Sequence, residues 1–150
     1  MLLQEGKILS TAKTPEIILN SGGSIIIKGR WSIEDNANFS KVLSDWYDKY
    51  IFDLPEVTKI DIRIEYFSGL NLFILISLLR KISCIKLIRR KLTINWYYEE
   101  GDEDILEIGE YISSVLDTAF NYILIPDNKL SVNFAKTEVE ESNPNNLSAG

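Results

Sequence analysis

The fold is decided by residues 59–71, which run Lys59-Ile60-Asp61-Ile62-Arg63-Ile64-Glu65-Tyr66-Phe67-Ser68-Gly69-Leu70-Asn71. The first eight residues alternate apolar and charged side chains, the period-two pattern of a β-strand with one covered face. From Leu70 to about Arg90 the pattern is that of a long helix. The sequence therefore predicts a strand that enters a helix through a short polar turn. At such a helix N-terminus an anion or a phosphorylated hydroxyl is electrostatically favoured.

The segment before this unit predicts a hairpin followed by a helix. Two apolar runs, residues 14–19 and 24–29, flank Asn20-Ser21-Gly22-Gly23, which is a strong hairpin signal. Asp35 is placed to cap a helix. The apolar residues of that helix recur at helical spacing and are Phe39, Val42, Leu43, Trp46 and Tyr50.

The segment after this unit predicts another strand at 92–98, a third helix opening at 101–104, and a final strand at 120–125. The expected core residues of the third helix are Ile105, Ile108, Gly109, Ile112, Val115 and Leu116. The order is then β-β-α-β-α-β-α-β. Successive β-α-β crossovers imply an α/β domain with a mixed, partly parallel sheet of about five strands and three helices.

Composition excludes several classes of function. The chain has 150 residues, a net charge of −6 and no histidine. An acidic chain lacks the basic footprint that nucleic-acid binding requires. Without histidine it lacks the usual general base near neutral pH and the commonest zinc ligand. The single cysteine, Cys84, lies in an apolar helical stretch and is expected to be packed and inert. The carboxylates of residues 99–107 fit a solvated helix start better than a metal site. Neither an enzyme nor a cofactor is expected.

We expect one domain at residues 13–136, between a leader at 1–12 and a polar tail at 137–150. The most apolar run, residues 70–79, contains Asn71 and Ser77 and ends at Arg80, which is too short for a bilayer span. No signal peptide is evident. A cytoplasmic location without membrane insertion is therefore expected.

Several segments together resemble the SiaC family of regulatory phosphoproteins, which have a STAS-like architecture. The most specific is Asn95-Trp96-Tyr97-Tyr98-Glu99-Glu100-Gly101-Asp102-Glu103-Asp104-Ile105-Leu106-Glu107. The others are Thr14-Pro15-Glu16-Ile17, Gly29-Arg30, Glu34, Asp45-Trp46, Glu65-Tyr66-Phe67 and Phe120-Asn121. In order and spacing they cover about residues 14 to 126.

The resemblance implies a non-enzymatic bacterial signalling protein that works by partner switching. It implies three partners: a protein kinase, a PP2C-type phosphatase and a diguanylate cyclase-type effector that makes cyclic di-GMP. It also implies a phosphoacceptor threonine just after the central strand. In this chain Gly69 stands at the threonine position, and Ser68 is the hydroxyl that remains in the turn. The phosphoswitch is thus expected to be altered or lost.

The candidate site is the turn and the first part of the following helix. Ser68 is a candidate phosphoacceptor, with the alternative that it is an ordinary helix N-cap. The candidate partner-binding residues are Tyr66, Phe67, Ser68, Gly69, Leu70, Asn71, Leu72, Phe73 and Ile76.

The extra apolar residues of this helix leave two interpretations open. On a helical projection Leu72 falls at the edge of the core stripe, and Phe73 and Ile76 fall outside it. They either form a surface that docks a partner or a second copy in a homodimer, or belong to a more deeply buried helix. A different function, a carrier of a small apolar ligand, is suggested by the apolar residues around Phe73 and Trp96. A deep pocket beside Ser68 would favour the carrier, and a flat apolar patch would favour docking.

Overall fold

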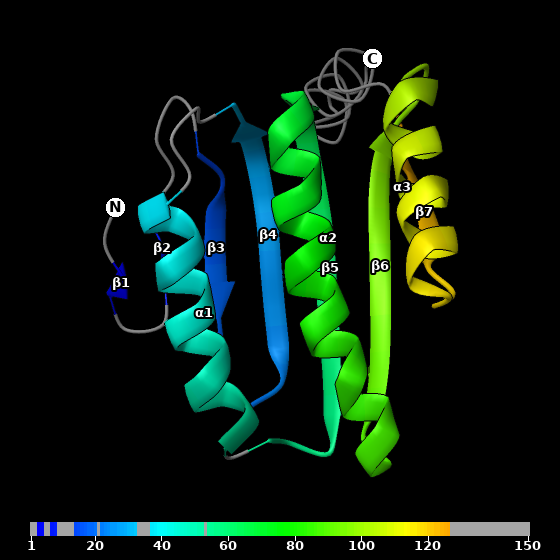
Figure 1. Ribbon diagram of the computed structural model, residues 1–150. Helices are drawn as coiled ribbons and strands as arrows, with labels where there is room; N and C mark the ends of the chain where they lie inside the picture. Colours follow the sequence, from blue (N-terminus) through cyan, green and yellow to red (C-terminus); the bar gives the residue numbers. More distant parts are fainter. Residues whose placement is uncertain are drawn as a thin grey trace, which may run out of the picture.

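The computed structural model describes residues 3–4, 7–8, 14–20, 22–32, 37–52 and 54–126. These residues form a seven-stranded sheet with a layer of helices on one face (Figure 1). The elements are β1 (Leu3–Gln4), β2 (Lys7–Ile8), β3 (Glu16–Leu19), β4 (Ser24–Trp31), α1 (Ala37–Phe52), β5 (Val57–Phe67), α2 (Gly69–Ser83), the 3-10 helix η1 (Cys84–Ile88), β6 (Lys91–Glu99), α3 (Glu103–Leu116) and β7 (Asn121–Ile125).

The strands lie side by side in the order in which they occur in the chain. Neighbours from β1 to β4 are antiparallel, and neighbours from β4 to β7 are parallel. The five longer strands, β3 to β7, and the three α-helices confirm the predicted mixed sheet. The predicted hairpin forms between β3 and β4. β5 pairs with β4 on one side and β6 on the other, which confirms that residues 57–67 are a central strand.

The helices α1, α2 and α3 cover the same face of the sheet (Figure 1). From β4 to β7 each crossover moves one strand position in the same direction. Because β-α-β crossovers are right-handed, repeated steps in one direction place every crossover helix on the same side. Helix α2 therefore lies over the middle of the sheet, between α1 and α3.

A row of aromatic rings crosses the sheet beneath the helices, through Trp31, Phe67, Trp96 and Phe120. Successive ring centroids are 6.0, 6.4 and 6.0 Å apart, distances typical of interacting rings. Trp96 is fully buried, and its indole N–H donates a hydrogen bond of 2.9 Å to the carbonyl oxygen of Ile105 in α3. The row thus joins β4, β5 and β6 to the residue preceding β7. Through its hydrogen bond to Ile105, Trp96 also fixes α3 to the sheet.

A β-bulge inverts the side-chain alternation at the end of β5. Gly29 of β4 is paired with Ile64, whereas Arg30 is paired with Tyr66, so Glu65 is the extra residue. Before the bulge the even-numbered residues of β5 face the helices; after it, Phe67 packs between the tryptophans and Tyr66 is exposed. Bulges of this kind re-aim side chains next to functional sites.

The opposite face of the sheet carries polar side chains. The Oδ1 atom of Asp61 accepts hydrogen bonds from Asn95 Nδ2 at 2.8 Å and from the Tyr97 hydroxyl at 3.3 Å. Asn95 Oδ1 in turn accepts from Asn121 Nδ2 at 2.9 Å. Burial, and then the neighbouring Asp61 carboxylate, raise the pKa of the Tyr97 hydroxyl. A sheet face lined in this way is stable without a covering helix.

Two details of the helices differ from the prediction. The long helix expected from Leu70 to Arg90 ends at Ser83 and continues as the 3-10 turn η1, which Arg89 stops in a left-handed conformation at φ 64°. In α3 the buried positions are Ile105, Gly109 and Ile112, whereas Val115 is exposed. The buried stripe of α3 is narrower than predicted because the helix lies at the edge of the sheet, above β6 and β7 (Figure 1).

Parts of the predictions fall outside the described residues. These are the proposed cap Asp35, residue Glu34 of the family resemblance, and the tail at 137–150. Within the segment expected to be a leader, β1 and β2 form short strands, and β2 pairs with β3. The domain boundaries stay a prediction.

Gly109 allows α3 to approach β6 closely. A Cβ atom at this position would lie 2.6 Å from the indole nitrogen of Trp96, well inside van der Waals contact. Glycine within a helix costs about 1 kcal/mol relative to alanine. The glycine is therefore a packing requirement of the Trp96 site.

We expect Gly109→Ala to lower the free energy of unfolding by about 1–3 kcal/mol, because the methyl group forces α3 or Trp96 from its place. Urea denaturation measures this change. Gly69→Ala is the matched control, since a Cβ there meets no atom within 4 Å, and it should raise stability by about 0.4–1 kcal/mol. Equal stability of the Gly109→Ala variant and the parent chain would contradict the packing argument.

Candidate functional site

The turn between β5 and α2 is held by the last residue of β4. The backbone N–H of Ser68 donates to the carbonyl oxygen of Trp31 at 3.0 Å. The side chain of Asn71 donates to the same carbonyl at 2.9 Å. Two donors from the turn thus converge on one acceptor, and the start of α2 is fixed to the end of the neighbouring strand.

Asn71 is the structural centre of this turn. Its side chain is fully buried, and its Nδ2 atom also donates to the hydroxyl oxygen of Ser68. Its Oδ1 atom is buried and has no hydrogen-bond partner among the described residues. Since a buried side chain cannot contact a docked protein, Asn71 shapes the turn rather than its outer surface.

Ser68 occupies the N-cap position of α2 without the usual capping hydrogen bond. Its backbone is extended, at φ −85° and ψ 158°, and its hydroxyl accepts from the Asn71 side chain instead of from a first-turn amide. The expectation that this oxygen caps the helix backbone was therefore wrong. Ser68 is half-buried, and its hydroxyl oxygen is engaged by the Asn71 amide, so the hydroxyl is only partly accessible to a kinase.

Gly69, the first residue of α2, is exposed and has open space around it. A Cβ atom built on it would meet no atom within 4 Å, and its φ is outside the left-handed range that favours glycine. A Cβ atom would therefore fit here without a clash or backbone strain. For Leu70, only the backbone position in α2 is described.

The aromatic residues before the turn point in opposite directions. Tyr66 is exposed, and the guanidinium of Arg30 lies over its ring at 4.9 Å from the centroid. Phe67 packs between Trp31 and Trp96 in the core. Of the two, Tyr66 is the one available to a partner.

The first two turns of α2 divide between surface and core. Phe73 is 64% exposed, Leu72 is half-buried, and Ile76 is 7% exposed and belongs to the core. The prediction that Ile76 lies outside the buried stripe was wrong. Its burial follows from the position of α2 between two other helices, which widens the buried face beyond the side toward the sheet.

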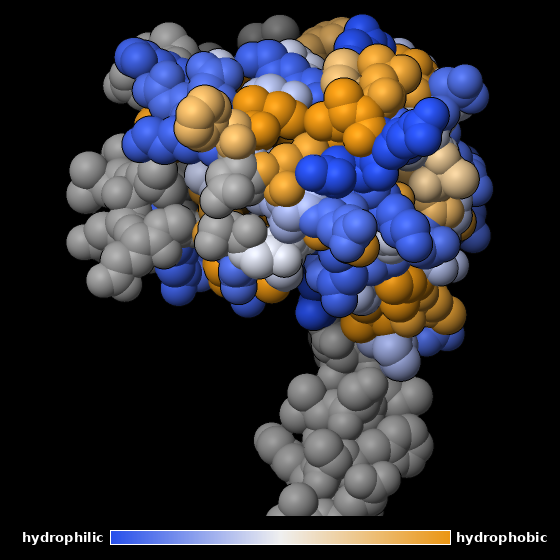
Figure 2. Space-filling view, turned by 90° about the horizontal axis from the view of Figure 1, so that it is seen from below, coloured by the Kyte–Doolittle hydropathy of each residue, from blue (hydrophilic) through white to orange (hydrophobic). Residues whose placement is uncertain are grey.

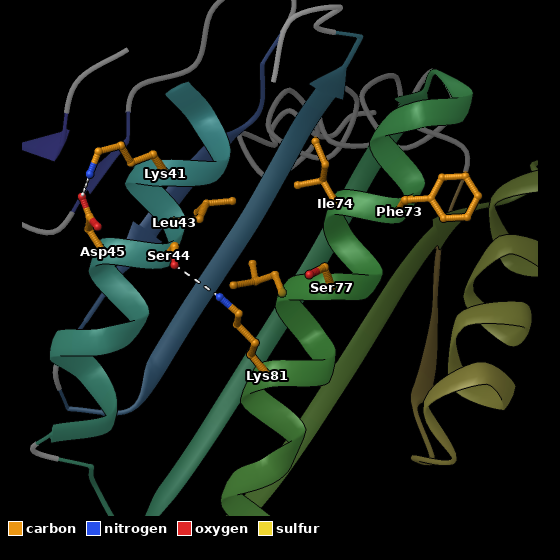
Figure 3. Close-up of a pocket in the computed structure, with 9 residues that line it drawn as sticks. Lys41, Leu43, Ser44, Asp45, Phe73, Ile74, Ser77 and Lys81 are labelled. Carbon is orange, nitrogen blue, oxygen red and sulfur yellow. Dashed lines mark hydrogen bonds and ion pairs between the residues drawn. The ribbon is translucent and has the colours of Figure 1, made fainter. Parts of the chain in front are cut away.

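A groove of about 580 Å³ lies between α1 and α2 beside Phe73. Its lining residues are Lys41, Leu43, Ser44, Asp45, Phe73, Ile74, Ser77, Leu78 and Lys81. In Figure 3 the Leu43 side chain extends toward α2, while the Phe73 ring extends away from α1. Lys81 Nζ donates to Ser44 Oγ at 3.2 Å across the groove, and Lys41 pairs with Asp45 at 3.1 Å.

A second hollow lies on the other side of α2, toward α3. Leu72 and Ile108 form its apolar part, and Asp104 and Glu107 its acidic part. Tyr111, which is exposed, also lines it. Phe73 therefore lies near the N-terminal end of α2, between the groove toward α1 and the acidic hollow toward α3.

The structure offers little support for a ligand pocket at the positions that suggested one. Trp96 is enclosed by Phe67, Phe120 and Gly109, and Ser68 lines none of the clefts described above. Among the described residues, none are grouped so as to hold a metal ion. The expectation of a packed Cys84 was wrong, because the thiol is exposed and contacts the carbonyl oxygen of Arg80 at 3.5 Å.

None of the helices in the described part of the chain has the length and apolar content needed to span a bilayer.

Two features of the site were not anticipated from the sequence. The bulge at Glu65 has no local sequence signal that separates it from regular alternation, although Gly29 opposite it, at φ 118°, is a hint. The α1 side of the groove, including Ser44 and Asp45, could be found only after the crossover placed α1 beside α2.

Comparisons with known proteins agree on one family. The model of the SiaC family regulatory phosphoprotein matches residues 8–125. The crystal structure of diguanylate cyclase SiaD in complex with its activator SiaC from Pseudomonas aeruginosa contains a chain that aligns with a TM-score of 0.70 and 19% identity, over 81% of this chain and 98% of that chain. The structure of apo-SiaC from the same organism gives 0.67 and 18%, over 79% and 95%. No curated protein sequence matches this chain.

We expect Asn71→Asp to destabilise the fold by about 1–3 kcal/mol at neutral pH, because it removes both donated hydrogen bonds and buries a carboxylate against the Trp31 carbonyl oxygen. Burial should raise the pKa of the new carboxyl, so the penalty is present at pH 7 and falls as the pH decreases toward that pKa. Denaturation at pH 5 and pH 7 measures it. Ser68→Ala, which leaves the contacts to Trp31 in place, is the control and should cost less; equal losses would refute the role of Asn71.

Proposed function

This chain belongs to the SiaC family of regulatory phosphoproteins, and on that premise we propose that it is a non-enzymatic regulator that docks onto a signalling enzyme. The proposed target is a diguanylate cyclase-type effector in the cytoplasm. The SiaC structure that resembles this fold is described as the activator of a diguanylate cyclase with which it forms a complex. A regulatory role also suits a chain without histidine.

The observation that carries the proposal is the exposure of Phe73 on α2. Phe73 is about two-thirds exposed and lies beside an open groove. Exposed apolar surface of this kind is unfavourable in a monomer, and its burial in an interface contributes free energy of binding. Covering Phe73, Leu72 and the neighbouring Tyr111 would remove on the order of a few hundred Å² of apolar surface from water. At roughly 25 cal/mol per Å² this gives several kcal/mol before the cost of association.

The surface also defines the chemistry of its partner. Grooves on both sides of a helix accommodate an amphipathic helix, whose apolar side chains recur at helical spacing. On the α3 side, Asp104 and Glu107 border the hollow. A partner helix that places lysine or arginine beside its apolar anchors would match them.

We further propose that this chain docks without control by phosphorylation at position 69. Gly69 has no hydroxyl, and the hydroxyl of Ser68 is bonded to Asn71. A kinase and a PP2C-type phosphatase remain proposed partners by family resemblance, with Ser68 as the candidate acceptor. Intact-mass analysis of the protein from its native cells shows directly whether it carries a phosphate.

An apolar-ligand carrier is the weaker alternative. The groove between α1 and α2 has the volume of a small-molecule site, but it is open and carries Lys41, Asp45 and Lys81 on its rim. A carrier encloses most of its ligand. The proposed docking function is tested with purified diguanylate cyclases of the source organism, by measuring binding and the rate of cyclic di-GMP formation from GTP. Failure to bind any of them would contradict the proposal.

We expect Phe73→Lys to weaken binding to the effector at least tenfold while leaving the protein folded, because the side chain is exposed in the free chain. Calorimetric titration and thermal melting measure the two effects. Phe52→Lys, an exposed phenylalanine at the far end of α1, is the matched control and should bind as the parent chain does. A collapsed melting temperature for Phe73→Lys would show that Phe73 is core, and sedimentation of the parent chain tests docking to a second copy.

We expect Gly69→Asp to weaken effector binding about tenfold, since it places a carboxylate where the family resemblance puts a phosphorylated residue. The fold should be retained or slightly stabilised, because the site has room and an acidic residue suits a helix N-terminus. Gly69→Ala controls for the lost glycine. If Gly69→Asp and Gly69→Ala bind equally well, the turn lies outside the interface.

A further inference from the structure

The end of the molecule farthest from the Ser68 turn combines protruding apolar side chains with cations. It is formed by the end of α1, by η1 and by the starts of β5 and β6 (Figure 1). Phe52 is 92% exposed and Leu87 is 83% exposed, and Ile88 is also exposed. Figure 2, which looks onto this end, shows apolar and hydrophilic residues side by side on its surface. We call Phe52 and residues 86–91 the basal patch.

The basal patch is basic in an acidic protein. Residues 86–91 run Lys86-Leu87-Ile88-Arg89-Arg90-Lys91, with four cations and no carboxylate, whereas the whole chain has a net charge of −6. The side chains of Arg89 and Lys91 are exposed and form no ion pair with the described residues. Lys86 donates to the hydroxyl of Thr118, a neutral partner.

Carboxylates are present nearby, including Asp53 next to Phe52 in the sequence, but no ion pair joins a carboxylate to the run among the described residues. Glu56 precedes β5, and its backbone carbonyl oxygen, not its carboxylate, accepts the N–H of Lys91; Asp117 follows α3. Asp48 and Lys49 are neighbours near the end of α1. The larger acidic group, at residues 99–107, lies at the other end of the sheet, about 20 Å away along the length of α2. At physiological salt the Debye length is about 8 Å, so that group is screened from the basal patch.

The shape of the patch favours a fluid partner over a protein. Leu87 and Phe52 project from the ends of two different helices, and a protein partner would need a matching pocket for each. The interfacial region of a bilayer accommodates such side chains without preformed pockets, and anionic lipid headgroups attract flanking lysine and arginine residues. A second copy related by two-fold symmetry would set the two cationic patches against each other.

Arg89 ends η1 and places the apolar residues of the patch at the tip of a turn. It holds a left-handed backbone at φ 64°, a position where glycine would be unstrained. Its amide donates to the carbonyl oxygen of Lys86, which closes the turn and leaves Leu87 and Ile88 at its tip. A charged side chain thus occupies a position where the backbone geometry favours glycine.

We propose that the basal patch binds peripherally to an anionic membrane surface, with Leu87 and Phe52 entering the interfacial region and the cations contacting lipid headgroups. This goes beyond the proposed regulatory function and does not depend on it. Because the patch is opposite the Ser68 turn, a membrane-bound molecule would keep the docking face of α2 free.

The test is sedimentation of the full chain with vesicles of phosphatidylcholine alone or with about 30 mol% phosphatidylserine, whose negative surface potential attracts lysine and arginine. We expect binding to the anionic vesicles, weakening as salt is raised. Leu87→Ser and Phe52→Ser should each reduce binding at least fivefold. Arg89→Gly should reduce it about fivefold, the effect of one cation near the surface, without loss of thermal stability.

The matched controls remove an exposed apolar residue and an exposed cation elsewhere. Leu124→Ser on β7 and Lys28→Gln on β4 should bind as the parent chain does. No binding to anionic vesicles overturns the proposal. Binding that the patch variants leave unchanged also overturns it, as does equal binding to neutral vesicles. In those cases an acidic protein or a second copy remains as the occupant, and concentration-dependent sedimentation without lipid identifies the latter.

Discussion

The handedness of the crossovers is the constraint on which the rest of this structure depends. Four parallel strands in chain order, joined by right-handed crossovers, place all three α-helices of the described residues on one face of the sheet. Since α2 is then flanked by two helices, its buried face is wide enough to take in Ile76. The surface that remains on α2 is a narrow strip that includes Phe73.

The same topology separates the molecule into two functional ends. Parallel strands all finish at one edge, so the Ser68 turn, the exposed Tyr66 and the acidic start of α3 lie together there. The helices all finish at the opposite edge, where Phe52 and η1 form the basal patch. The proposed docking surface and the proposed membrane contact are therefore distant, and one molecule could use both at once.

The Ser68 turn is shaped by buried contacts that join its own residue Asn71 to the end of β4. The carbonyl oxygen of Trp31, at the end of β4, accepts hydrogen bonds from the Ser68 amide and the Asn71 side chain. The bulge at Glu65 turns the Phe67 side chain into the aromatic row. Gly69 is outside this network and has room around it. A change at position 69 would therefore alter the chemistry of the turn while the fold is kept.

The sequence by itself determined the central strand and the order of the elements from β3 to β7, because these follow from local periodicity and from turn residues such as Gly23. It placed Phe73 outside the core stripe but left open whether the side chain is exposed, which the structure decided. Its resemblance to the SiaC family rested on several segments, of which residues 95–107 were the most specific, and the family match confirms it. Only the tertiary structure decided that Tyr66 faces outward, that Ile76 is buried, that Asn71 rather than a backbone amide bonds Ser68, and that Leu87 protrudes. Each of these depends on which segments become neighbours, since a bulge, a flanking helix and a buried amide act through partners far away in the chain.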